Sequence, residues 1–301
     1  MSDTTQDTPR TDRRTRLILH GKAAARPPVR EAVRLVRESG HPLEVRVTWE
    51  GGDTQRLTRE AVADGVDCVV AGGGDGTLNE VASTLASHQR PAAELPSFGM
   101  LPQGTANDFA RSCGVPLDPT EALRLVATTA PRPIDLGRMG DRYFINVATG
   151  GVGTEITVET PEDLKRMLGG AAYFVTAIKK LGELTAVPAA FAGNGFEWSG
   201  EFGVLGIGNG RQAGGGNVLC PEATIDDGLL DVRILPPLTG STLQEALRDL
   251  IANGPDANEN WVLSARVPWV SIEAERETQI NLDGEPIRSS TFRFDIVPAA
   301  L

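Results

Sequence analysis

The stretch Gly72-Gly73-Gly74-Asp75-Gly76-Thr77-Leu78-Asn79-Glu80 decides the fold of this chain. It follows the apolar run Asp67-Cys68-Val69-Val70-Ala71, which predicts a buried strand. Apolar residues at helical spacing come after it and predict a helix from about Thr77. A strand, a glycine-dense turn and a helix N-terminus form an anion site, because glycines expose the backbone and the first N–H groups of the helix point at the turn. The predicted ligand is a nucleotide phosphate.

The turn fits neither of the common phosphate-loop patterns. Thr77 or Asn79 holds the place of the last glycine in G-x-G-x-x-G, and no Lys-Ser/Thr pair closes the turn as in a P-loop. An NAD dehydrogenase and a P-loop ATPase are therefore disfavoured, whereas a strand-to-helix turn without a ligand stays open. A bare carboxylate repels phosphate, so Asp75 indicates either a metal or a fixed hydrogen bond to the loop.

Composition narrows the class of protein. The 301 residues suffice for two domains, although one large α/β domain is also compatible. The net charge of −11 argues against sequence-independent nucleic-acid binding and against a broad basic surface for anionic lipid, but allows local basic patches. Three dispersed cysteines predict reduced thiols in a cytoplasmic protein. Polar residues 1–16 predict a disordered tail. The lack of a long apolar stretch predicts a protein that is soluble or that touches membranes only at their surface.

Two differently organised halves follow from the pattern of strands and helices. Strands alternate with helices up to about residue 133, which predicts a mostly parallel sheet covered on both faces. The turns at 20–22, 72–77 and 102–107 then lie on the one edge where such sheets bind ligands. Beyond that point strands dominate and helices are expected only at about 161–183 and 242–253, so the second domain is antiparallel and β-rich. Its hairpin signals are Gly140-Asp141, Asn194-Gly195, Asp227-Gly228 and Asp283-Gly284.

A second polar cluster, Gly104-Thr105-Ala106-Asn107-Asp108, follows the strand expected at 97–101. Thr105 and Asn107 are suited to capping a helix, and capping alone explains them as well as ligand binding does. The position of the cluster beside the glycine turn favours ligand binding, because both turns would face the same site.

Several ordered motifs resemble the bacterial lipid kinases of the diacylglycerol kinase catalytic-domain family, and most of all its YegS-type members. The resemblance runs from about Leu17 to Leu301. It is carried by RVTWE at 46–50, GGGDGTLNEV at 72–81, LPQGTANDFAR at 101–111, NVATGGVGT at 146–154, GIGNGRQAGGG at 206–216, DDGLLDVRI at 226–234 and LDGEP at 282–286. Family members often carry Asn where this chain has His20, which puts any inherited role of that position in doubt, whereas Lys22 is retained.

The resemblance implies two domains with ATP in the cleft between them. The first is an α/β nucleotide-binding domain related to those of NAD kinases and phosphofructokinases, at 17–135 and completed by 290–301. The second is a β-rich, sandwich-like domain at 136–289. By family position the nucleotide contacts are Thr48, Gly74, Asp75, Gly76, Thr77, Leu78, Asn79, Glu80 and Thr105.

The resemblance also implies the chemistry. Glu285 matches the proton acceptor, and Asp227 with the carbonyls of Thr224 and Leu229 matches a metal site for Mg²⁺, with Ca²⁺ as a structural or regulatory alternative. Phosphoryl transfer depends on positioning and charge neutralisation, which these groups can supply. From spacing alone, however, Asp283-Gly284 is more simply a hairpin turn with Glu285 as a solvated charge, and Asp227-Gly228 has the same alternative.

The resulting hypothesis is an ATP-dependent kinase that phosphorylates a lipid hydroxyl, of the diacylglycerol or phosphatidylglycerol type, at the inner face of the membrane. A soluble-substrate kinase of the NAD kinase type and a non-catalytic nucleotide- or lipid-binding regulator are the alternatives. No nucleic-acid partner is expected. The sequence leaves the lipid, the metal and the oligomeric state open.

Overall fold

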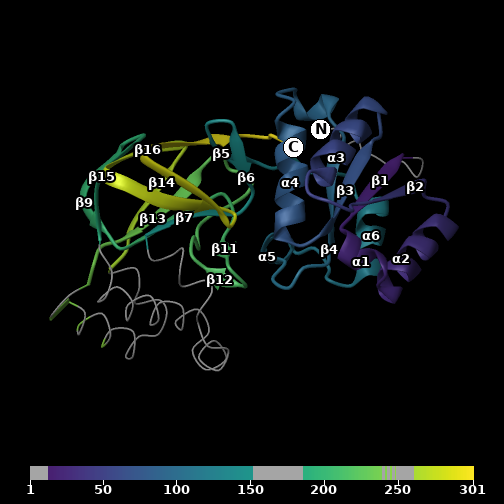
Figure 1. The fold of residues 1–301 in the computed structure, drawn as a ribbon, viewed down its shortest axis with the longest axis horizontal. Coiled ribbons are helices and arrows are strands. Elements are labelled where there is room, and N and C mark those ends of the chain that lie inside the picture. Colours follow the sequence, from purple (N-terminus) through teal and green to yellow (C-terminus); the bar gives the residue numbers. More distant parts are fainter. Residues whose placement is uncertain (1–12, 152–185, 239–240, 243–244, 246–247, 249–260) are drawn as a thin grey trace, which may run out of the picture. The chain divides into compact units, whose positions relative to one another are not determined.

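A computed structural model of the chain describes residues 13–151, 186–238, 241–242, 245, 248 and 261–301 (Figure 1). The chain divides into two compact units. Unit 1 comprises Met1–Ile134 and Ala299–Leu301, and unit 2 comprises Asp135–Pro298. No helix among the described residues is long and apolar enough to cross a bilayer.

Unit 1 is built on a four-stranded parallel sheet. Its strand order is β2 (Leu43–Val47), β1 (Thr15–Leu19), β3 (Cys68–Gly73) and β4 (Ser97–Pro102). Every residue of the central strands β1 and β3 is buried, because helices cover the sheet on both faces. The edge strand β2 is buried at Leu43 but exposed at Val47.

Two pairs of helices cover this sheet (Figure 1). On one face α2 (Pro27–Glu38) packs against α6 (Pro119–Thr128), and Val29, Val33 and Leu123 share a core with Leu17 and Leu19. On the other face α3 (Asp53–Ala63) packs against α4 (Asp75–Ala86). The short helices are α1 (Gly21–Ala24), α5 (Asp108–Ser112) and the 3₁₀ turn η1 (Ala92–Glu94).

Local sequence explains where the covering helices begin. Asp118 caps α6, since its Oδ1 accepts the backbone N–H groups of Thr120 and Glu121 at 2.9 and 3.0 Å. Proline occupies the first turns of α2 and α6, where its missing N–H costs nothing. These starts hold the helices against the sheet and leave its carboxyl edge to the turns between elements.

In its described residues, unit 2 is an antiparallel β domain with a ten-stranded sheet and a small two-stranded one. The order of the large sheet is β14-β13-β10-β7-β15-β16-β5-β6, and β8 joins β15 to β9. The strands are β5 (Leu136–Met139), β6 (Arg142–Phe144), β7 (Val147–Gly151), β8 (Val187–Gly193), β9 (Phe196–Phe202), β10 (Val204–Gly208), β11 (Gln212–Ala213), β12 (Asn217–Val218), β13 (Leu230–Leu235), β14 (Leu263–Val267), β15 (Trp269–Leu282) and β16 (Glu285–Val297).

A large apolar core lies in the described part of unit 2. Alternate residues of β15 and β16, including Ile272, Phe292 and Phe294, point into it. The rings of Phe144 and Phe294 meet edge to face with centroids 6.2 Å apart. Three of the four predicted two-residue turns connect paired strands, namely β5–β6, β8–β9 and β15–β16. The predicted fold class, α/β followed by a β-rich unit, is confirmed.

The structure differs from the sequence prediction at three places. Strand β1 begins at Thr15, so the predicted tail of residues 1–16 is too long, because Arg16 is buried between Glu44 and Asp64. Of residues 290–301 only Ala299–Leu301 group with unit 1, since β16 pairs with β15 and β5. Asp227-Gly228 leads into β13 and is not a hairpin turn. The helix expected at 161–183, and most of that at 242–253, lie outside the described residues.

Candidate functional site

The turns after β1 and β4 both join the end of β3 in unit 1. The backbone N–H of His20 donates to Gly72 O, and that of Gln103 donates to Gly73 O, each at 2.7 Å. These bonds continue the parallel pairing one step past the strands, so all three turns lie at the carboxyl edge of the sheet, as predicted.

The glycine turn and the Gly104 turn touch through their backbones. A Cβ added to Gly104 would lie 2.5 Å from Gly74 Cα, and one added to Gly74 would lie 3.1 Å from Gly104 Cα. A side chain at either position would push the two turns apart. The close approach gives a surface of bare backbone, which is the kind of cradle that suits a phosphate chain.

Asp75 is a brace between the two turns. Its Oδ1 accepts the backbone N–H of Phe109, in the first turn of α5, at 3.1 Å. The carboxylate also lies in the first turn of α4, where a negative charge is stabilised by the helix dipole. Of the two roles that the sequence left open for Asp75, this geometry supports the fixed hydrogen bond.

Asn107 closes the Gly104 turn rather than capping α5. It takes a left-handed conformation with φ of 53°, and its own side chain makes no capping hydrogen bond to α5. Its Oδ1 accepts Gly104 N–H at 2.8 Å and its Nδ2 donates to Gly104 O at 3.0 Å. The buried amide thus fixes the turn from within and leaves Thr105 exposed at its tip.

The predicted nucleotide residues from 74 to 80 differ in what they can offer. Gly74, Asp75, Gly76 and Thr77 form the start of α4, where the first N–H groups have no intrahelical acceptor and no side-chain cap is present. Leu78 is only 1% exposed and its N–H donates to Gly74 O, so it supports the core instead. Farther along the helix, the Ser83 hydroxyl donates to Asn79 Oδ1, and Glu80 is half-buried.

Thr48 lies beside the turn that follows β1. Its Oγ1 accepts the backbone N–H of Gly21 at 3.3 Å, while its own N–H donates to Leu19 O at 3.0 Å. His20 caps α1, because its Nδ1 accepts the Lys22 N–H at 3.2 Å. His20, where family members often carry Asn, is therefore compatible with a well-formed turn. The Lys22 side chain is exposed.

The segment after Thr48 is fixed by Asp53. The carboxylate accepts the backbone N–H groups of Trp49 and Glu50 at 2.7 and 3.1 Å. A hydrogen bond from Arg56, together with these two N–H groups, lowers the pKa of Asp53 to about 2. Asp53 thus ties the segment before α3 to Arg56 within that helix.

Glu285 is the first residue of β16 in unit 2, directly after the Asp283-Gly284 turn. Both turn residues have positive φ, 47° and 94°, as a tight turn of this length requires. Leu282 and Glu285 face each other across the hairpin, and the Glu285 side chain is exposed. This position is compatible with a proton acceptor and equally with a solvated charge.

Asp283 anchors that turn to the start of β7. Its carboxylate accepts three consecutive backbone N–H groups, from Ile145 at 2.7 Å and from Asn146 and Val147 at 3.0 Å. A run of N–H groups converging on one carboxylate fixes it firmly. The sequence predicted the turn but not that Asp283 anchors it to β7. The only signal of this in the sequence is that the residue before Gly284 is acidic.

The predicted metal ligands do not form a cation site as they are arranged. Asp227 Oδ1 accepts Leu229 N–H at 2.9 Å, and Asp227 Oδ2 forms an ion pair with Arg266. Thr224 and Leu229 carbonyls would suit Mg²⁺ or Ca²⁺, but the guanidinium holds the carboxylate that a cation needs. Across the described parts of both units, no group of three or more His, Cys, Asp or Glu side chains could hold a metal.

The backbone cradle at the carboxyl edge of its sheet is typical of nucleotide-binding α/β proteins, and unit 1 forms it with glycine turns instead of a P-loop. The diacylglycerol kinase catalytic domain family matches residues 14–139, and the YegS C-terminal NAD kinase beta sandwich-like domain matches residues 147–301. The chain therefore belongs to the diacylglycerol kinase catalytic-domain family. This membership makes it a lipid kinase, which is a phosphotransferase. It also implies a nucleoside triphosphate as the phosphoryl donor, together with a divalent metal.

Curated relatives agree with this assignment, and solved structures share the fold. Proteins named "Probable lipid kinase YegS-like" are 53% identical in Xanthomonas oryzae pv. oryzae (strain MAFF 311018) and 51% identical in Pseudomonas putida, over 95–96% of this chain and 94% of each relative. A diacylglycerol kinase structure from Bacillus anthracis str. Sterne aligns with a TM-score of 0.72 and 25% identity, over 96% of this chain and 95% of that one. Another structure from that organism aligns with a TM-score of 0.79 and 23% identity, over 99% of this chain and 97% of that one.

Proposed function

We propose that the protein transfers the γ-phosphoryl group of ATP to a hydroxyl of a glycerolipid, of the diacylglycerol or phosphatidylglycerol type. The observation that carries the ATP assignment is the backbone contact between Gly74 and Gly104, beside the uncapped start of α4. That arrangement offers N–H donors at a surface free of side chains, and it suits a phosphate chain. Thr48 and the exposed Thr105 flank it on neighbouring turns.

Glu285 is the proposed general base. Its carboxylate takes the proton from the acceptor hydroxyl while the hydroxyl oxygen bonds to the γ-phosphorus. The bond from that phosphorus to the bridging oxygen breaks, and ADP leaves with the electron pair. The bonds from three N–H groups to Asp283 support this role, because they restrict the turn that carries Glu285.

A divalent metal bound with ATP would neutralise phosphate charge during the transfer. The metal site at Thr224, Asp227 and Leu229 stays a prediction, since Arg266 pairs with Asp227. No step of the proposed mechanism depends on a cation at that loop. Membrane contact at the bilayer surface likewise belongs to the proposal and follows from the choice of a lipid acceptor.

The test replaces Glu285 with Gln and measures phosphate transfer and nucleotide binding separately. Exposed Glu277 on β15 provides the matched control, Glu277→Gln. We expect the Glu285 variant to lose about 10²–10⁴ in kcat with nucleotide affinity unchanged, which is the usual contribution of a general base. Undiminished transfer would remove Glu285 from the mechanism.

A panel of acceptors separates this function from the alternatives. Labelled ATP is supplied with dispersed diacylglycerol, phosphatidylglycerol or NAD, and the products are identified by mass spectrometry. Phosphorylated lipid supports the proposal. Phosphorylated NAD would favour the soluble-substrate kinase, and nucleotide binding without any transfer would favour the regulator.

A further inference from the structure

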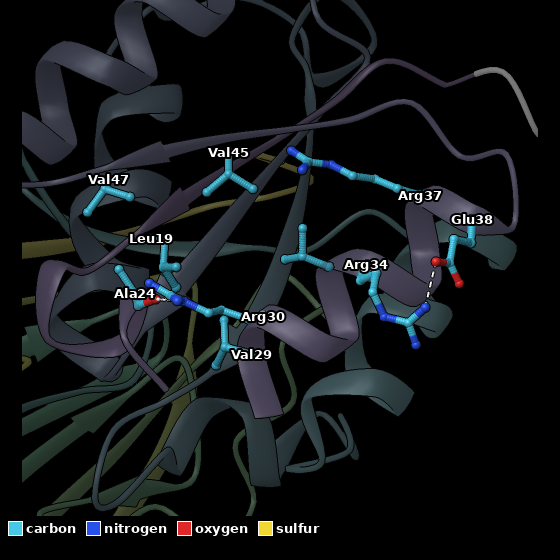
Figure 2. Close-up of a pocket in the computed structure, with 10 residues that line it drawn as sticks. Leu19, Ala24, Val29, Arg30, Arg34, Arg37, Glu38, Val45 and Val47 are labelled. Atoms are coloured by element: carbon cyan, nitrogen blue, oxygen red, sulfur yellow. Dashed lines mark hydrogen bonds and ion pairs between the residues drawn. The ribbon is translucent and has the colours of Figure 1, made fainter. Parts of the chain in front are cut away.

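Unit 1 has a groove whose lining contains none of the residues proposed to bind the nucleotide. It measures about 510 Å³ and lies between α2 and the edge strand β2 (Figure 2). That volume is typical of small-molecule sites, which run from about 300 to 1,000 Å³. The groove exists because β2 has a neighbour on one side only, and because α2 leaves Val45 and Val47 incompletely covered.

The apolar part of the groove's lining consists of Leu19, Ala24, Val29, Val33, Val45 and Val47. The charged part consists of Arg30, Arg34, Arg37 and Glu38. Val47 is 47% exposed, and Trp49, two residues beyond it, is 93% exposed. The two residues expose apolar surface at the end of β2, and tryptophan is enriched at membrane interfaces.

Three arginines of α2 border the groove, but only two of them keep a free charge. Arg34 forms ion pairs with Glu31 at 2.6 Å and Glu38 at 2.5 Å. In contrast, Arg30 Nε donates to the carbonyl of Ala24 at 3.1 Å, and Arg37 Nε donates to that of Leu43 at 2.9 Å. Among the described residues no carboxylate forms an ion pair with Arg30 or Arg37.

The two free arginines reach over the apolar lining. Figure 2 shows Arg30 and Arg37 extending from α2 toward the strands, and Arg34 turning to Glu38. One Nε bond to a carbonyl orients each guanidinium and leaves its terminal nitrogens for another acceptor. This local positive charge contrasts with the net charge of −11 for the chain. Apolar lining and oriented guanidinium groups together are complementary to an anionic amphiphile.

We infer that this groove binds anionic phospholipid of the bilayer surface, with Arg30 and Arg37 each facing headgroup phosphate and the start of an acyl chain against Val45 and Val47. The inference rests on the proposed function for its membrane setting. It concerns a binding site separate from the transfer site, one that would hold unit 1 at an anionic membrane. Unlike the broad basic surface that the net charge excludes, it needs only two arginines.

The test measures binding of the full chain to phosphatidylcholine vesicles with and without phosphatidylglycerol. The variant is Arg30→Gln/Arg37→Gln, and the control Arg59→Gln/Arg90→Gln removes the same charge from exposed positions elsewhere in unit 1. We expect the first to bind phosphatidylglycerol vesicles about 30-fold more weakly, from about 1 kcal/mol for each arginine at an anionic surface. The control is expected to bind like the wild type.

A second variant, Val47→Glu, tests the apolar part by placing a carboxylate in the groove at an exposed position, where the fold tolerates it. It is expected to weaken vesicle binding as well. Binding that is undetectable in the wild type, equal in all variants, or indifferent to phosphatidylglycerol would overturn the inference. A change of oligomeric state by light scattering with vesicle binding intact would also overturn it, because the groove would then be a contact between copies.

Activity toward a short-chain diacylglycerol that stays monomeric in water distinguishes this inference from the proposed function. If the function holds, the wild type and both groove variants phosphorylate this acceptor at the same rate. If the wild type phosphorylates neither this acceptor nor a short-chain phosphatidylglycerol, the proposed function fails, whereas vesicle binding by the groove can still be measured.

Discussion

The bonds of Asp283 give the sharpest prediction, because they can be removed without changing the turn. Asparagine tolerates the left-handed conformation of position 283, where φ is 47°, so Asp283→Asn keeps the backbone. Its amide oxygen retains part of the acceptor function, but its NH₂ group faces donors, and at least one of the three N–H groups loses its partner. A hydrogen bond to a charged group contributes about 1.5–3 kcal/mol, so we expect a loss of about 2 kcal/mol in the free energy of unfolding.

Thermal unfolding measures this loss. For a unit of this size, about 2 kcal/mol lowers Tm by roughly 4–8 °C. Asp141→Asn is the matched control, because Asp141 is an exposed residue in another two-residue turn, between β5 and β6. The control is expected to stay within about 0.5 kcal/mol of the wild type. A Tm for Asp283→Asn equal to that of the control would refute the anchoring role.

The same variant also tests the link to catalysis. If the anchored turn positions Glu285, Asp283→Asn lowers kcat even when kcat is measured at a temperature below the Tm of the variant. Nucleotide affinity is expected to stay constant. A loss of stability without any change in kcat would show that the bonds serve folding alone.

Three further variants test the remaining features. Gly104→Ala places a Cβ 2.5 Å from the facing turn and is expected to weaken ATP binding at least tenfold by calorimetry, whereas Gly51→Ala, which meets nothing within 4 Å, is the neutral control. Asp75→Ala is expected to weaken nucleotide binding equally with and without Mg²⁺, and an effect seen only with Mg²⁺ would show a metal role instead. Arg266→Ala frees Asp227, so added Ca²⁺ should raise Tm in this variant more than in the wild type, and equal responses would argue against a cation at this loop.

The elements of unit 1 were predictable because their signals are local. The apolar run before Gly72 and the glycines that follow it specify a strand and a turn without reference to the rest of the chain. The shared edge of the turns also follows, since parallel strands place their carboxyl ends together. Three of the four hairpin turns of unit 2 were predictable for the same reason.

The bonds that fix the site were not predictable, because their partners are far apart in sequence. Asp75 bonds to Phe109 and Asp227 pairs with Arg266, and neither partner lies in the same motif. Asn107 was expected at the start of a helix, and it does stand there, yet its amide closes on Gly104 instead. Spacing alone left Asp75 between two roles, and only the position of α5 favours one of them.

The place of β7 in the large sheet has a consequence for how the chain folds. β7 lies between β10 and β15, and its anchor to Asp283 joins residues 136 to 138 positions apart. During synthesis β7 therefore emerges well before either neighbour, and its edge toward β15 stays unpaired until the end of β15 has been made. Such late, long-range pairing is slow and leaves strand edges open to other chains. We expect refolding of unit 2 to be the step most prone to aggregation.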